Sequence, residues 1–247
     1  MALLEVKNVS KDFGGLRAND NISFNMEADE VVGLIGPNGA GKTTLFNCIA
    51  GFFPVSAGQV FFKGQNITSL KDFQICHLGL ARTFQIFQAS GDLSVLENVM
   101  VGSFVRTRSR GKARAKARQW LEFLDIADAG PLVLSELPVA RQKRVALATA
   151  LASDPKLLLL DEVAAGLNAA EIDGLVQLLR RIHAEKNIAL LLTEHVMEMV
   201  MALSHRVVVL ESGRKIAEGE PSEVVQDPEV IRAYLGDHLV KDEDDDA

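Results

Sequence analysis

The stretch Gly36-Pro37-Asn38-Gly39-Ala40-Gly41-Lys42-Thr43-Thr44 decides the fold of this chain. It fits the pattern Gly-x-x-x-x-Gly-Lys-Ser/Thr. The apolar residues 31–35 before it predict a buried strand, and residues 45–50 continue as a helix. A strand, a glycine-rich turn and a helix in this order direct backbone amides and a helix N-terminus toward a polyphosphate. We therefore expect these nine residues to bind a nucleoside triphosphate.

Two side chains of this phosphate loop are suited to specific roles. Lys42 supplies a positive charge for the β- and γ-phosphates, and the Thr43 hydroxyl suits the Mg²⁺ that bridges them.

The bulk composition is that of a globular protein. The 247 residues are 48% hydrophobic, enough for one large domain with its own core. No apolar run has the length that spans a bilayer, and residues 1–5 lack a secretory signal. We therefore expect a cytoplasmic protein.

Charge is unevenly distributed along the chain. The formal net charge is −7, and residues 241–246 hold five acids and one lysine, so we expect a disordered, solvated tail over 237–247. Residues 106–118 instead carry seven bases and no acid. A solvated helix face is the favoured interpretation of this basic stretch, and contact with anionic lipid headgroups is the alternative.

The remaining pattern predicts an α/β fold. Strand-like alternation opens the chain, with Phe13-Gly14-Gly15 as a turn, and a second strand pair surrounds residues 59–65. Residues 94–127 are helical and charged in pattern. The apolar runs 157–160 and 188–192 predict parallel strands buried on both faces, separated by an amphipathic helix over 171–186. This alternation indicates a mostly parallel core sheet.

Polar side chains follow two of the predicted buried strands. Asp161 and Glu162 come after residues 157–160, at the sheet edge where ligands of such folds bind. Asp161 suits the Mg²⁺ shell, directly or through water, and Glu162 suits a general base for an attacking water. A plain helix N-cap is the alternative for this pair. His195 follows the next strand, where a structural histidine is the commoner case, and Gln85 alone is uninformative.

Several motifs of this chain occur in the same order as in a known protein family. They are Phe13, the phosphate loop, Gln85, residues 137–144, residues 157–162, Gly166-Leu167-Asn168 and His195. The chain resembles the ATP-binding subunit of an ATP-binding cassette (ABC) transporter over nearly all its length. More narrowly, it is similar to the branched-chain amino acid uptake ATPases, through Arg82-Thr83-Phe84-Gln85, residues 164–168 and 216–219, and above all residues 228–236.

The resemblance implies a fold and a set of roles. The fold is an ABC-type nucleotide-binding domain over residues 1–236, with an antiparallel β subdomain and a helical insert at about 90–155. Phe13 would stack on adenine, Gln85 would reach Mg²⁺ and the γ-phosphate, and Glu162 would be the base. His195 would hold the γ-phosphate geometry. Asn168 would lie in a loop that crosses to a second ATPase subunit.

The resemblance also implies partners. Two such subunits sandwich two ATP molecules, and their closure drives integral membrane permease subunits on the cytoplasmic face of the membrane. The second subunit is a copy of this chain or a related ATPase. A solute-binding protein acts indirectly, and no nucleic acid is expected.

The signature that faces the partner's ATP departs from the family's usual Leu-Ser-Gly-Gly-Gln. Here it is Leu137-Pro138-Val139-Ala140-Arg141. Pro138 lacks the serine hydroxyl and a backbone donor, and Ala140 adds a methyl group where the backbone approaches phosphate. Arg141 either offers charge to a phosphate or lies in solvent. We therefore expect weakened or asymmetric composite sites in a working ATPase.

Three alternatives remain at this point. The first is a nucleotide-gated dimerisation module with little ATPase activity. The second is a soluble ABC ATPase that acts on nucleic acid or ribosomes, which the basic stretch alone supports. The third is the ATPase of a lipopolysaccharide exporter, whose match to the final segment is poorer.

Overall fold

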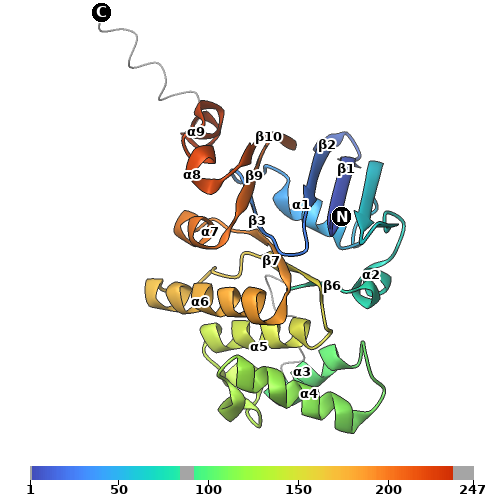
Figure 1. The fold of residues 1–247 in the computed structure, drawn as a ribbon, viewed down its shortest axis with the longest axis vertical. Helices are drawn as coiled ribbons and strands as arrows, with labels where there is room; N and C mark the ends of the chain where they lie inside the picture. Colours follow the sequence, from blue (N-terminus) through green and yellow to red (C-terminus); the bar gives the residue numbers. More distant parts are fainter. Residues whose placement is uncertain (1, 84–91, 236–247) are drawn as a thin grey trace, which may run out of the picture.

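A computed structural model describes residues 2–83 and 92–235, which form two β-sheets and the helices around them (Figure 1). The larger sheet has the strand order β10-β9-β3-β8-β7-β6. Its members are β3 (Val31–Ile35), β6 (Leu80–Arg82), β7 (Leu157–Asp161), β8 (Ala189–Thr193), β9 (Arg206–Glu211) and β10 (Arg214–Gly219). Its neighbouring strands are parallel except that β10 runs antiparallel to β9. This is the mostly parallel core sheet that the sequence predicts.

The smaller sheet is antiparallel, with the order β2-β1-β4-β5. Its members are β1 (Leu4–Phe13), β2 (Leu16–Met26), β4 (Ala57–Phe62) and β5 (Gln65–Asn66). Phe13 pairs with Leu16 across the two-residue turn Gly14-Gly15, and Gly14 has φ +57°. Glycine takes this left-handed conformation at little cost, so the turn brings Phe13 to the tip of a tight hairpin.

Helices cover both faces of the larger sheet. Those outside the insert are α1 (Lys42–Ile49), α2 (Asp72–Leu78), α6 (Ala169–Lys186), α7 (Met197–Leu203), α8 (Pro221–Val224) and α9 (Pro228–Leu235). Successive strand residues point to opposite faces. Leu158 and Leu160 therefore pack with α6 and α7, whereas Leu157 and Leu159 pack with α1 and the small sheet. All residues of β3, β7 and β8 are buried.

Three helices follow one another between β6 and β7 and lie together at one end of the molecule (Figure 1). They are α3 (Val95–Ser103), α4 (Arg110–Phe123) and α5 (Val139–Leu151), with 3₁₀ turns at Ala127–Ala129 and Leu134–Glu136. Ala113, Ala117 and Leu121 recur every four residues on α4 and are buried, which is the spacing of one helix face. No helix among the described residues is both long and apolar enough to cross a membrane.

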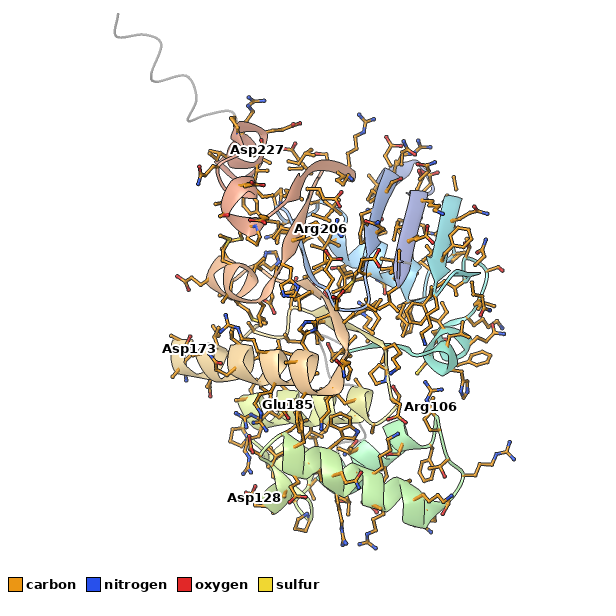
Figure 2. The ribbon with its side chains drawn as sticks, in the orientation of Figure 1. Arg106, Asp128, Asp173, Glu185, Arg206 and Asp227 are labelled. Carbon is orange, nitrogen blue, oxygen red and sulfur yellow. The ribbon has the colours of Figure 1, made fainter. Side chains whose placement is uncertain are left out.

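The basic stretch divides into two groups. Arg106 lies where these helices meet the α2 region (Figure 2), and its guanidinium donates hydrogen bonds to the carbonyls of Ser153 and His77, each at 2.7 Å. Lys116 pairs with Asp154. The arginines 108, 110, 114 and 118 and Lys112 are exposed. Arg106 and Lys116 thus join parts of the fold, and the other five bases form a charged surface.

Candidate nucleotide-binding site

The phosphate loop connects β3 to α1 and is pressed between two other strands. A Cβ atom at Gly36 would lie 2.0 Å from the Leu210 carbonyl oxygen of β9. A Cβ atom at Gly41 would lie 2.4 Å from the Asn19 amide of β2. Both glycines also have positive φ, +146° and +95°. Only glycine fits at positions 36 and 41. The close packing fixes the loop, so that the first amides of α1 stay available for an anion.

The ammonium of Lys42 lies inside this loop. It donates hydrogen bonds to the carbonyls of Gly36 at 2.7 Å and Pro37 at 3.0 Å. Burial lowers the pKa of Lys42, and the nearby carboxylates of Glu162 and Asp161 oppose that shift. A polyphosphate in the loop would offer this ammonium charged oxygen atoms in place of neutral carbonyls.

A cleft of about 570 Å³ unites much of the predicted site. Its predicted members are Phe13, residues 38–44, Glu162 and His195, and it adds Leu16, Arg17, Ala18, Ser212 and Gly213. Phe13 is 43% exposed and lines the cleft, so part of its surface is open to a ligand. Phe53 meets that ring edge-on, with centroids 5.4 Å apart, and the Lys11 ammonium lies 4.8 Å from its centroid. These two neighbours hold the Phe13 ring in place.

Asp161, the last residue of β7, is buried and hydrogen-bonded through both carboxylate oxygen atoms. Thr193 donates its hydroxyl to Oδ1 at 2.7 Å, and Arg82 donates Nη2 to Oδ2 at 2.6 Å. Only 2% of Asp161 is exposed, so these donors replace water around its charge. Each oxygen atom keeps a second lone pair for a metal-bound water.

Glu162 points differently from its neighbour and meets His195. The distance from His195 Nε2 to Glu162 Oε1 is 3.0 Å. Glu162 has φ +48°, a left-handed conformation that is uncommon outside glycine, asparagine and aspartate. Its amide donates to the Thr193 carbonyl at 2.9 Å, which holds the backbone in this conformation. The turn moves the Glu162 carboxylate away from the buried sheet and into the cleft.

Glu194 is a buried acid for which sequence analysis assigned no role. It is 3% exposed, and its Oε1 accepts a hydrogen bond from the Ala164 amide at 2.8 Å. Burial raises the pKa of Glu194, although the bonds from the Ala164 and His195 amides and the charge of Lys143 act in the opposite direction. This carboxylate therefore joins the loop after Glu162 to the segment that carries His195.

The signature segment begins helix α5. Pro138 precedes its first turn, and Val139 at its start is 52% exposed. Arg141 forms an ion pair with Asp128 of the same chain. Figure 2 labels Asp128 beside the helical insert. Ala140 and Asn168 line one hollow of about 310 Å³, so the signature and the loop before α6 share a surface.

Helix α9 also reaches the phosphate loop. Burial raises the pKa of the Tyr234 hydroxyl, and a hydrogen bond from the Gly36 backbone opposes this shift. Val230, on the same helix, is part of the main core. The C-terminal segment is thus packed against the nucleotide site, a contact between residues that are far apart in sequence.

The oxygen donors at the loop fit Mg²⁺ held mainly by phosphates. Thr43 offers a hydroxyl and Asp161 a carboxylate, the hard ligands that this cation prefers. Within the described residues, no group of three or more His, Cys, Asp or Glu side chains could hold a metal. Gln85, the other predicted ligand, lies outside the described residues.

Comparison with known proteins identifies the relatives of this arrangement. The family described as "ABC transporter" matches residues 19–165, and "Branched-chain amino acid ATP-binding cassette transporter" matches residues 214–240. The high-affinity branched-chain amino acid transport ATP-binding proteins BraF of Pseudomonas aeruginosa and LivG of Escherichia coli K12 are each 36% identical to the chain. Each alignment covers 95% of this chain and 98% of the relative.

Solved structures agree with these matches. A nucleotide-free ATP-binding cassette from an ABC transporter superposes with a TM-score of 0.88 at 30% identity, covering 96% of this chain and all of the other. A dimeric ATP-binding cassette in a post-hydrolysis state, bound to ADP and Pi, superposes with a TM-score of 0.80 at 25% identity. That alignment covers 88% of this chain and 98% of the other.

Proposed function

The chain belongs to the ATP-binding subunits of ABC transporters, and on that premise we propose that it hydrolyses ATP to drive uptake of branched-chain amino acids. The observation that carries this proposal is the cleft that joins the phosphate loop to Glu162 and His195. The match of residues 214–240 to the branched-chain amino acid transporters supports the class of solute. We treat residues 1–236 as one ATPase domain with a helical insert at about 90–155.

Nucleotide binding uses both ends of the cleft. Phe13 stacks on the adenine, with its ring held by Phe53 and Lys11. The phosphates lie against the amides of the loop and the N-terminus of α1. Lys42 moves its hydrogen bonds from the loop carbonyls to phosphate oxygen atoms.

Hydrolysis uses the pair Glu162 and His195. The Glu162 carboxylate accepts a hydrogen bond from the attacking water and takes its proton as the water oxygen bonds to the γ-phosphorus. The bond from the γ-phosphorus to the bridging oxygen breaks at the same time, and ADP leaves with the electron pair of that bond. His195, 3.0 Å from that carboxylate, orients it and contacts the γ-phosphate. Thr43, Asp161 and Gln85 are the residues that would hold a bound Mg²⁺, which would supply positive charge to the phosphates. Asp161 is held by Arg82 and Thr193, so it does not compete as the base.

The complete site uses a second ATPase subunit, either a copy or a relative. The exposed start of α5 at Val139 and the neighbouring Asn168 form the surface that faces it. The amides of α5 bind the partner's γ-phosphate, with less help from side chains than a Ser-Gly-Gly signature gives. The dimeric cassette among the structural neighbours supports this arrangement.

The permease is proposed to contact a groove between the core and the helical insert. This groove, about 220 Å³, is lined by Phe52, Phe73, Arg82, Gly102 and Ser153 among others. Phe52 and Phe73 are 40% and 57% exposed, an aromatic surface suited to a protein partner. The chain would then lie on the cytoplasmic face of the membrane, with the solute-binding protein acting through the permease.

Hydrolysis by the purified chain tests this function. We expect Mg²⁺-dependent phosphate release from ATP that falls at least 100-fold in Glu162→Gln, a variant that removes the base and keeps the side chain's shape. Glu198→Gln, an exposed glutamate outside the cleft, serves as the matched control. ATP binding without turnover, with or without the permease, would instead favour the nucleotide-gated module, which the relatives' names do not favour.

Transport tests the solute. Proteoliposomes that contain the permease and this chain should accumulate leucine, isoleucine or valine when ATP is inside, and the Glu162→Gln chain should not support this. Uptake of another solute class in the same vesicles would contradict the proposed specificity.

A further inference from the structure

Arg82 joins three elements of the core through one buried guanidinium group. It is the last residue of β6, and 7% of its side chain is exposed. Its Nη2 donates to Asp161 Oδ2 of β7 at 2.6 Å, and its Nη1 donates to Asn47 Oδ1 of α1 at 2.6 Å. Because the guanidinium is planar and rigid, the bond to Asn47 sets the direction from which Nη2 reaches Asp161 Oδ2.

The same guanidinium also lies over two phenylalanine rings. The Arg82 Cζ atom lies 6.0 Å from the ring centroid of Phe46, which is fully buried, and 5.7 Å from the ring centroid of Phe52. Phe52 is 40% exposed and lines the groove between the core and the insert, as Arg82 itself does. One side chain therefore contacts both the groove and the carboxylate beside the phosphate loop.

We propose that Arg82 is a positioning residue that transmits the state of this groove to Asp161 and thereby sets the site's affinity for the divalent cation of Mg·ATP. The inference rests on the proposed function, because it assumes that the cleft binds Mg·ATP. A change at Phe52 shifts the guanidinium, and the guanidinium turns the carboxylate. The coupling is local, because Phe52 contacts the Arg82 guanidinium and that guanidinium donates directly to Asp161.

A purely structural role for Arg82 makes a different prediction. In that case the arginine only neutralises a buried acid, and Phe52 at the surface has no influence on the cation. The affinity for ATP without metal reports the loop and Phe13, whereas the Mg²⁺ concentration that tightens binding reports Asp161. Measuring both quantities separates the two roles.

The experiment is a titration of a fluorescent ATP analogue against the full chain, first in EDTA and then with increasing Mg²⁺. The variants are Arg82→Lys, which keeps one charge and loses the two-pronged geometry, and Phe52→Ala. Phe73→Ala is the matched control, because Phe73 lines the same groove and is more exposed than Phe52. Circular dichroism establishes that each variant is folded.

We expect all four proteins to bind the analogue in EDTA within about twofold of one another. The half-saturating Mg²⁺ concentration should rise about 10-fold or more in Arg82→Lys, the usual effect of losing a group that orients a metal ligand. It should rise several-fold in Phe52→Ala and stay unchanged in Phe73→Ala. Equal Mg²⁺ dependence in Phe52→Ala and Phe73→Ala would overturn the transmission, even where Arg82→Lys fails to fold.

Failure of the proposed function is distinguishable in the same data. A wild-type chain that binds no analogue under any condition would refute Mg·ATP binding itself, and the role of Arg82 with it. A wild-type chain that binds normally, with both variants unchanged in Mg²⁺ dependence, would refute only the role of Arg82.

Discussion

Two consecutive acids at the end of β7 have very different surroundings. Asp161 is buried with a donor on each oxygen atom, whereas Glu162 leaves the strand through a left-handed turn and reaches the cleft. Neighbouring residues of a strand already point in opposite directions, and the turn at Glu162 separates them further. One acid is thus suited to a fixed charge beside the metal and the other to proton transfer.

The buried carboxylate of Glu194 predicts a pH-dependent stability. Because the pKa of Glu194 is raised in the folded protein, the folded chain holds the proton of this carboxyl group more tightly than the unfolded chain does. The contribution of Glu194 to stability is therefore fully present below the ordinary pKa of 4.5 and is lost as the pH rises through the raised value. Glu194→Gln removes the ionisation and keeps an oxygen atom for the Ala164 amide. We expect the variant to gain stability relative to the wild type between pH 5 and pH 8.

Urea unfolding at both pH values checks this expectation. Glu198→Gln, an exposed glutamate in the following helix, controls for a general effect of charge. A stability difference between Glu194→Gln and the wild type that is the same at pH 5 and pH 8 would contradict the buried ionisation.

At the scale of the element, the residue before α6 caps the helix and also lines the hollow beside the signature. Asn168 caps the helix: its Oδ1 accepts from the Glu171 amide at 3.0 Å, and Glu171 Oε2 accepts from the Asn168 amide at 2.9 Å. This reciprocal pair satisfies two amides that have no partner within the helix. Asn168 also lines the hollow shared with the signature.

Two substitutions separate these roles. Asn168→Ala should lower the free energy of unfolding by about 0.5–2 kcal/mol, the usual cost of losing a cap. Asn168→Asp should restore most of that stability, because aspartate caps equally well. If the side chain also serves the subunit interface, Asn168→Asp should still lose ATP hydrolysis while remaining stable. Equal activity of Asn168→Asp and the wild type would limit Asn168 to the cap.

At the scale of the whole molecule, the signature is the weakest part of the proposed double site. Pro138 and Ala140 offer neither the hydroxyl nor the close backbone approach of serine and glycine. We expect Pro138→Ser with Ala140→Gly to raise the ATP-dependent dimer fraction of the Glu162→Gln chain several-fold. Analytical ultracentrifugation with and without Mg·ATP measures this. A dimer fraction that does not respond would indicate that a related ATPase, rather than a second copy, completes the site.

Local patterns were enough to predict the sheet, the phosphate loop and the two acids at the end of β7. Each depends on residues close together in sequence: a glycine-rich turn, an apolar run, or an acid at a strand end. The parallel sheet then brings the ends of β3, β7 and β8 together, so the cleft follows from the topology. For this reason Glu162 and His195 meet although 33 positions separate them.

The partners that orient these groups could not be predicted in this way. Arg82 and Asp161 are 79 positions apart, and a single arginine after an apolar pair gives no sign of its partner. Glu194 stood beside the predicted His195, but an acid in sequence does not reveal that it is buried. Tyr234 belongs to the characteristic final segment, yet its contact with Gly36 depends on how α9 packs. Side-chain partners across elements require the packed structure.

The position of the helical insert has a consequence for engineering chimaeras. Because α3–α5 connect two neighbouring parallel strands, they form the crossover that such a pair cannot do without. If α3–α5 were exchanged to redirect the chain to a foreign permease, the connection between two strands of the central sheet would therefore be replaced as well. Splice points inside β6 and β7 preserve that sheet if they keep the pairing of Leu80 with Leu157. A short linker in place of the insert would instead leave the two strands unable to align.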